Sequence, residues 1–76
     1  MNKNRRERIQ QGIDKLNEAM DILQECLDEE QDYQDNMPEN LQASEKYERA
    51  GEAINSLEVA ISDIEEAISN AEESLD

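Results

Sequence analysis

An unbroken heptad pattern over residues 47–75 constrains the fold of this 76-residue chain more than any other feature of its sequence. Apolar side chains recur there at alternating steps of three and four residues, which is the pattern of a helix with one buried seam. The seam residues are Tyr47, Ala50, Ile54, Leu57, Ile61, Ile64, Ile68, Ala71 and Leu75. Another helix must cover this seam, and the rest of the sequence indicates where that helix is.

A matching series in the N-terminal half predicts a first helix over about residues 4–34. Its apolar residues also follow one another at steps of four and three. They are Ile9, Ile13, Leu16, Met20, Leu23 and Leu27. Asn4 is the expected N-cap of this helix, and Glu7, three residues later, is its expected capping-box partner.

The first series loses its apolar character before the helix is expected to end. Glu30 and Gln34 occupy the next two seam positions. Because neither side chain suits an apolar seam, we expect the first helix to fray or become exposed between residues 29 and 35.

Residues 35–43 are expected to form the turn between the two helices. Pro38 disfavours a helical conformation at the residue before it and readily starts a new turn. One short helical turn is therefore expected over residues 38–42. Ser44 is the expected N-cap of the second helix, which we predict over about residues 44–75.

A line of small residues accompanies each seam, one position before it. The line comprises Gly12, Ala19 and Cys26 in the first helix, and Ala53, Ala60 and Ala67 in the second. If the chain folds into an antiparallel hairpin, the small residues of the two helices face one another in pairs whose residue numbers add up to 79. The seam residues of the two helices face one another in pairs whose residue numbers add up to 80 or 81. All three totals centre the turn just after the proline. We therefore predict a single all-α domain, an antiparallel two-helix hairpin whose small residues form a close-packing line.

The predicted apolar face is too wide for one hairpin to cover. Ile22 lies beside Ala19 and Cys26 and widens the face further. A chain of this length buries only about 60% of the surface that it exposes when unfolded. We therefore predict that two hairpins associate as a homodimer into a four-helix bundle.

The charge balance indicates which partners suit the chain. It carries 21 acidic and 7 basic side chains, a net charge of −14. Such a charge disfavours direct contact with nucleic acid or an anionic membrane and suits basic proteins. Residues 1–16 carry five basic and two acidic side chains, a net +3. We expect the acidic C-terminal end of the hairpin to neutralise this basic segment, in preference to nucleic-acid binding by it.

The residue types argue against catalysis and metal binding. The chain has no histidine, no glycine-rich phosphate loop and no nucleophile elbow, so we expect no enzyme and no cofactor. The carboxylates of residues 28–35 lack the spacing of a calcium loop and are expected to form a solvated face. Cys26 is expected to be a small core residue. A single cysteine and the absence of a long apolar run indicate a cytoplasmic protein.

One surface near the turn is the candidate for binding a partner. It combines acidic side chains with apolar ones, and the same residues also have the simpler role of closing the hairpin. The candidate residues are Asp28, Glu29, Asp32, Tyr33, Asp35, Met37 and Glu39. A second hypothesis for the acidic surface is that it mimics nucleic acid and occupies the basic groove of another protein.

The sequence around the turn resembles that of a known group. The run Asp35-Asn36-Met37-Pro38-Glu39-Asn40-Leu41-Gln42, with residues 29–33, 44–48 and 53–58 around it, is similar to small acidic helical-hairpin proteins of phages and prophages. These proteins generally carry no assigned function. The resemblance implies a phage accessory role in the cytoplasm of an infected or lysogenic bacterium, and it transfers no catalytic or binding residue.

The sequence therefore predicts a small interaction protein of phage type. Its expected action is to modulate or inhibit a host protein, such as a defence protein, through protein–protein contacts. A nucleic-acid mimic and a structural or packaging component are the alternatives. Salt dependence of binding distinguishes a mimic from an apolar docking surface, because electrostatic binding weakens steeply as salt rises.

Overall fold

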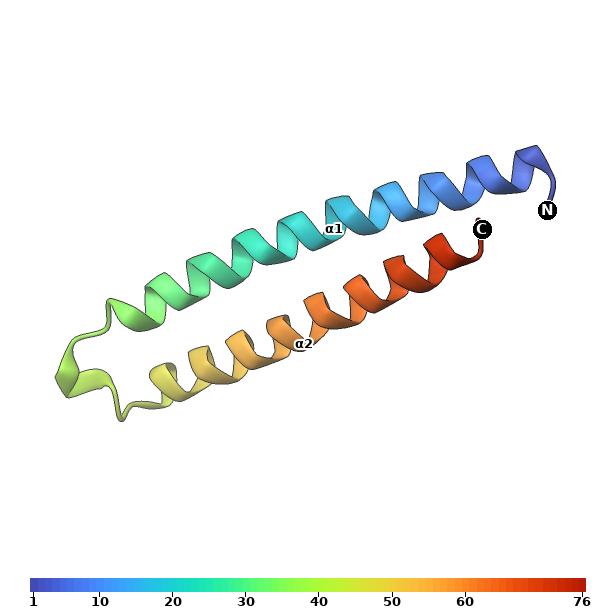
Figure 1. The fold of residues 1–76 in the computed structure, drawn as a ribbon. Coiled ribbons are helices and arrows are strands. Elements are labelled where there is room, and N and C mark those ends of the chain that lie inside the picture. Colours follow the sequence, from blue (N-terminus) through green and yellow to red (C-terminus); the bar gives the residue numbers. More distant parts are fainter.

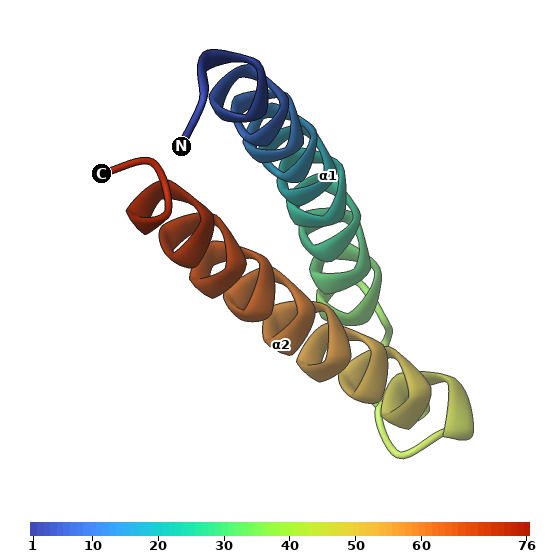
Figure 2. The same cartoon turned by 90° about the vertical axis from the view of Figure 1, so that its right-hand side faces the viewer.

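The computed structural model describes all 76 residues as two long helices joined by a short turn (Figure 1). Helix α1 spans Lys3–Asp35, the 3-10 turn η1 spans Glu39–Leu41, and helix α2 spans Glu45–Glu73. The helices run antiparallel, and both termini lie at the end away from the turn (Figures 1 and 2). The molecule measures 60 × 15 × 13 Å. The prediction of an all-helical hairpin is confirmed.

Helix α1 begins earlier than predicted. Its N-cap is Asn2, whose Oδ1 accepts a hydrogen bond from the backbone N–H of Arg5 at 2.7 Å. The predicted cap at Asn4 is therefore wrong. Asn2 offers the same capping group, and a cap there lets the helix include Lys3 and Asn4.

Helix α1 continues intact to Asp35, so it does not fray between residues 29 and 35, but most of these residues are exposed, which is the other predicted outcome. The side chain of Gln34 is half-buried, and its Nε2 donates a hydrogen bond to the carbonyl oxygen of Tyr47 at 3.3 Å. A polar side chain in the seam thus bonds the backbone of the opposite helix. This bond holds the last turn of α1 against the first turn of α2.

The turn is closed mainly by backbone hydrogen bonds. The N–H of Leu41 donates to the carbonyl of Pro38 at 2.9 Å, and the N–H of Ser44 donates to the carbonyl of Leu41 at 3.0 Å. Ser44 is the N-cap of α2, as predicted, and its Oγ accepts from the N–H of Tyr47 at 3.4 Å.

Two contacts at opposite ends of the hairpin fix one register along its whole length. Near the turn, Gln34 bonds Tyr47. Near the termini, a guanidinium N–H of Arg6 donates to the carbonyl oxygen of Leu75. The residue numbers total 81 in both pairs, which is one of the predicted totals. No residue is therefore inserted or skipped between the two ends.

The buried core follows that same set of facing positions. The buried residues are Ile13, Leu27, Ala50, Ile54, Ile61 and Ile68, and all but Ala50 belong to the pairs that total 81. The remaining predicted core residues are only half-buried. These are Ile9, Leu16, Met20, Leu23, Leu57 and Ile64. One hairpin thus buries most of the apolar residues whose pairs total 81, with Met20 left half-buried, and only half-buries those whose pairs total 80.

The small residues do not form the predicted close-packing line between the helices. Gly12, Ala19, Cys26 and Ala67 are exposed, and Ala53 and Ala60 are half-buried. A Cβ added at Gly12 would meet no atom within 4 Å. Because the helices meet along the pairs that total 81, the small residues lie to one side of the contact. The expectation that Cys26 is a core residue is therefore wrong for a single hairpin.

Candidate protein-binding surfaces

One flank of the hairpin is apolar and uncovered, and we call it the open face. Residues seven apart return to the same face of a heptad helix, so each line of small residues lies beside half-buried seam positions. The open face comprises Gly12, Leu16, Ala19, Ile22, Leu23, Cys26, Ala53, Leu57, Ala60, Ile64 and Ala67. Ile22 is 59% exposed at its edge. An apolar face of this length on a chain of net charge −14 is a candidate interaction surface.

The opposite flank is polar, and we call it the polar flank. It carries amide side chains on α1 and carboxylates on α2, all of them exposed. The residues are Gln10, Asn17 and Gln24 on α1, and Glu58, Glu65 and Glu72 on α2. This flank suits contact with water, so the hairpin has two unlike sides.

An open groove of about 740 Å³ lies at the turn end of the open face. Tyr33 follows Cys26 by seven residues and Lys46 precedes Ala53 by seven, so the two lines of the open face lead into this groove. Its lining residues are Tyr33, Asn36, Met37, Pro38, Leu41, Ser44, Glu45 and Lys46.

Closing the turn does not cover the apolar side chains of this groove. Tyr33 is 49% exposed and Leu41 is 46% exposed. The turn is held by backbone hydrogen bonds and by the side chains of Gln34 and Ser44. If these apolar residues served only to close the hairpin, we would expect them to be buried. About half of the surface of each of these two side chains is instead exposed.

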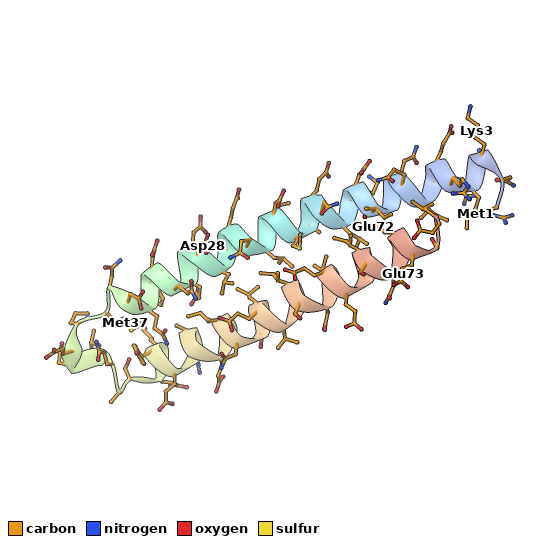
Figure 3. The ribbon with its side chains drawn as sticks, viewed as in Figure 1. Met1, Lys3, Asp28, Met37, Glu72 and Glu73 are labelled. Atoms are coloured by element: carbon orange, nitrogen blue, oxygen red, sulfur yellow. The ribbon has the colours of Figure 1, made fainter.

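The structure divides the predicted partner surface into two parts. Tyr33 and Met37 lie in the groove. The carboxylates are all exposed, and Asp28 projects from α1 on the side away from α2 (Figure 3). Asp32 and Asp35 follow Asp28 at steps of four and three, which places the three carboxylates on one outer face of α1. The sequence analysis did not include Leu41 and Lys46 among the groove residues. Leu41 could have been recognised, because a large apolar residue in a turn that backbone hydrogen bonds close is free to bind something else.

The turn end carries much of the negative charge of the chain. Residues 28–49 contain eight acidic and two basic side chains, a net −6. One of the two basic residues, Arg49, is already paired with Glu45 at 2.5 Å on the same helix. This ion pair is exposed and contributes little to stability.

The basic segment at the N-terminus lies beside the acidic C-terminal end, as predicted, but forms no ion pair with it. Met1 and Lys3 lie at the same end as Glu72 and Glu73 (Figure 3). However, the ion pair Arg49–Glu45 is the only one in the structure, so Lys3, Arg5 and Arg8 have no carboxylate within 4.0 Å. The basic side chains at this end therefore remain available to another molecule.

Three further features of the structure bear on metal binding, cavities and the membrane. No group of three or more His, Cys, Asp or Glu side chains could hold a metal ion. A second hollow, of about 430 Å³, lies near the C-terminus and is lined by Ser69, Glu72, Glu73, Leu75 and Asp76. Neither helix is long and apolar enough to cross a membrane.

Comparisons with protein-family models, with curated proteins and with solved structures find no match to this chain. The features that bear on function are therefore the two flanks of the hairpin and the charge of its two ends.

Proposed function

We propose that this protein acts by binding other proteins, and that its working form is a homodimer in which two hairpins make a four-helix bundle. The observation that carries the dimer is the open face. Its apolar side chains are exposed or only half-buried in one hairpin, whereas a second copy would bury them against identical residues.

The size of the exposed surface supports the dimer. The hairpin exposes 5737 Å². A compact protein of 8.7 kDa is expected to expose about 4,700 Å². The excess of about 1,000 Å² is similar to the roughly 800 Å² that each partner buries in a standard interface.

The acidic turn end supports a basic protein as the external partner. The carboxylates of Asp28, Asp32 and Asp35 are exposed on the outer face of α1, away from the open face, and would stay exposed if two hairpins associated. With the resemblance of the turn to phage hairpins, this favours a modulator or inhibitor of a host protein in the bacterial cytoplasm. A nucleic-acid mimic is the second candidate, because the same row of carboxylates suits a basic groove.

Charge reversal tests the external interaction. The bait is the immobilised dimer, exposed to bacterial proteins, and the variant D28K/D32K/D35K reverses the outer row. E58K/E65K/E72K is the matched control, because it reverses three exposed carboxylates on the polar flank. We expect a partner that the natural chain and the control retain and the first variant loses. Equal retention by all three proteins would contradict a role for the outer row.

Salt and competition distinguish the two candidates once a partner is retained. A mimic is expected to lose affinity steeply between 50 and 200 mM salt, on the order of 10³-fold for six phosphate-like contacts. Duplex DNA should then displace it. Retention that changes little with salt would exclude mimicry and favour a modulator that docks through other contacts.

A further inference from the structure

We infer that the second copy docks on the open face in the opposite direction, so that each turn-end groove receives the basic N-terminal segment of the other chain. This inference rests on the homodimer proposed above and adds its direction and register. It assigns an occupant to the groove at Tyr33 and a role to the unpaired basic residues Arg5 and Arg8.

The residues of α1 fit an antiparallel two-fold arrangement centred on Ala19. Gly12 and Cys26 lie seven residues before and after Ala19, so a two-fold axis at Ala19 places each of them opposite the other in the second copy. Both are exposed, and at Gly12 there is open space where a side chain would be. Small residues therefore face small residues along this contact, and the helices approach closely.

The residues of α2 fit the same axis. Ala53 and Ala67 lie seven residues before and after Ala60. Ala60 and Ala19 lie at the same level of the hairpin, since their numbers total 79. One axis at this level therefore relates α1 to its copy and α2 to its copy, as a closed dimer requires. The half-buried side chains of Leu23, Leu57 and their neighbours then become a common core.

Net charge favours the opposite direction over the same direction. Docking in the same direction would bring the two turn ends together, each with eight acidic and two basic side chains in residues 28–49. Docking in the opposite direction places each turn end beside a segment with five basic and two acidic side chains in residues 1–16. The second arrangement reduces repulsion between like charges and adds attraction between unlike ones.

The groove supplies a specific contact for this arrangement. An axis at Ala19 places Arg5 of one chain level with Tyr33 of the other, and Arg8 level with Glu30. Arg5 has no carboxylate within 4.0 Å in its own hairpin, and Tyr33 is 49% exposed. A guanidinium over a tyrosine ring is a favourable cation–π contact. The groove lining itself carries one charge of each sign, Glu45 and Lys46, so the surrounding carboxylates provide its negative field.

Cysteine cross-linking tests the direction, because the chain has a single and exposed cysteine. In the antiparallel dimer the two copies of Cys26 lie 14 residues apart along α1, about 21 Å at 1.5 Å per residue. That is too far for a disulfide, which needs Cα atoms within about 7 Å. A cysteine at position 19 instead faces its own copy across the axis. If the two hairpins instead dock in the same direction, a cysteine at any position lies level with its copy. Cysteines at positions 19 and 26 should then form disulfides at similar rates.

The experiment compares the natural chain with A19C/C26A under mild oxidation at low micromolar concentration. We expect A19C/C26A to form disulfide-linked dimers at least tenfold faster. If A19C/C26A loses helical content, a second variant, A60C/C26A, replaces it. Position 60 on α2 also faces its own copy, so we expect the same faster cross-linking. Equal rates at positions 19, 60 and 26 would overturn the direction of docking. Light scattering on the natural chain separates the two proposals: a folded monomer overturns the homodimer, whereas dimers with equal cross-linking rates overturn only its direction.

Discussion

The open face and the polar flank lie on the same two helices, on either side of the buried core. On the polar flank, Gln24 and Glu58 stand beside the core and are exposed to water. On the open face the corresponding places are held by Cys26, Ala53 and their neighbours, which offer water little to bond. A hairpin that worked alone would be expected to have polar residues on both sides of its seam. The asymmetry supports the proposal that one side faces water and the other binds a protein surface.

Replacing a seam residue of the open face with a charged one should have the largest effect. L57D places a carboxylate among the half-buried side chains, at an expected cost of about 3–5 kcal/mol in the free energy of unfolding. We expect loss of helical signal, or dissociation at low concentration, by circular dichroism and light scattering. V59D is the matched control, because Val59 is 61% exposed on the same helix. Similar behaviour of the two variants would contradict the register.

Truncating the core should separate folding from association. I54A removes a side chain that is 8% exposed within one hairpin, and we expect it to cost about 2–5 kcal/mol of folding stability. I22A removes an exposed side chain from the edge of the open face, and we expect it to weaken the dimer while sparing the hairpin. Thermal melts at several protein concentrations measure both effects. A melting temperature of I22A that responds to concentration as the natural chain does would remove Ile22 from the interface.

Coupling between Arg5 and Tyr33 should be smaller but more diagnostic. Within one chain these residues lie 28 positions apart on α1, about 42 Å, so they cannot touch. A double-mutant cycle with R5A and Y33A is expected to give a coupling of about 0.5–1 kcal/mol in dimer affinity. Additive effects of the two substitutions would mean that Arg5 does not reach the groove of the other chain.

Substitutions on the polar flank should have the smallest effect. Replacing Glu65 with glutamine removes one exposed carboxylate that has no ion-pair partner in the structure. We expect the free energy of unfolding and the dimer affinity to change by less than about 0.5 kcal/mol. A larger loss of either quantity would mean that the two flanks do not differ as described.

Much of the fold could be predicted from the sequence because two independent signals agree. The heptads define the facing positions, and the proline places the turn, so the antiparallel hairpin and facing pairs such as Leu27 with Ile54 could be predicted without any structure. The position of the small residues could not be predicted in the same way. A heptad pattern gives three possible lines of contact, and only packing decides that Ile54 and Ile61 are buried while Ala19 and Cys26 are exposed.

The groove could be predicted only in part. Tyr33 and Met37 stood out beside an acidic cluster, but Leu41 did not. Its exposure depends on how the short 3-10 turn at Glu39–Leu41 directs the side chain, and heptad spacing does not extend into that turn. The N-cap was also misplaced because Asn2 and Asn4 offer the same capping chemistry, and the choice depends on the length of the helix.

Light scattering across a dilution series tests most directly whether the open face binds a second copy. We expect a molar mass of twice 8.7 kDa at micromolar concentration, with helical signal that falls as dilution separates the chains. A molar mass of 8.7 kDa with full helical signal at every concentration would show that the open face needs no second copy, and would contradict the account.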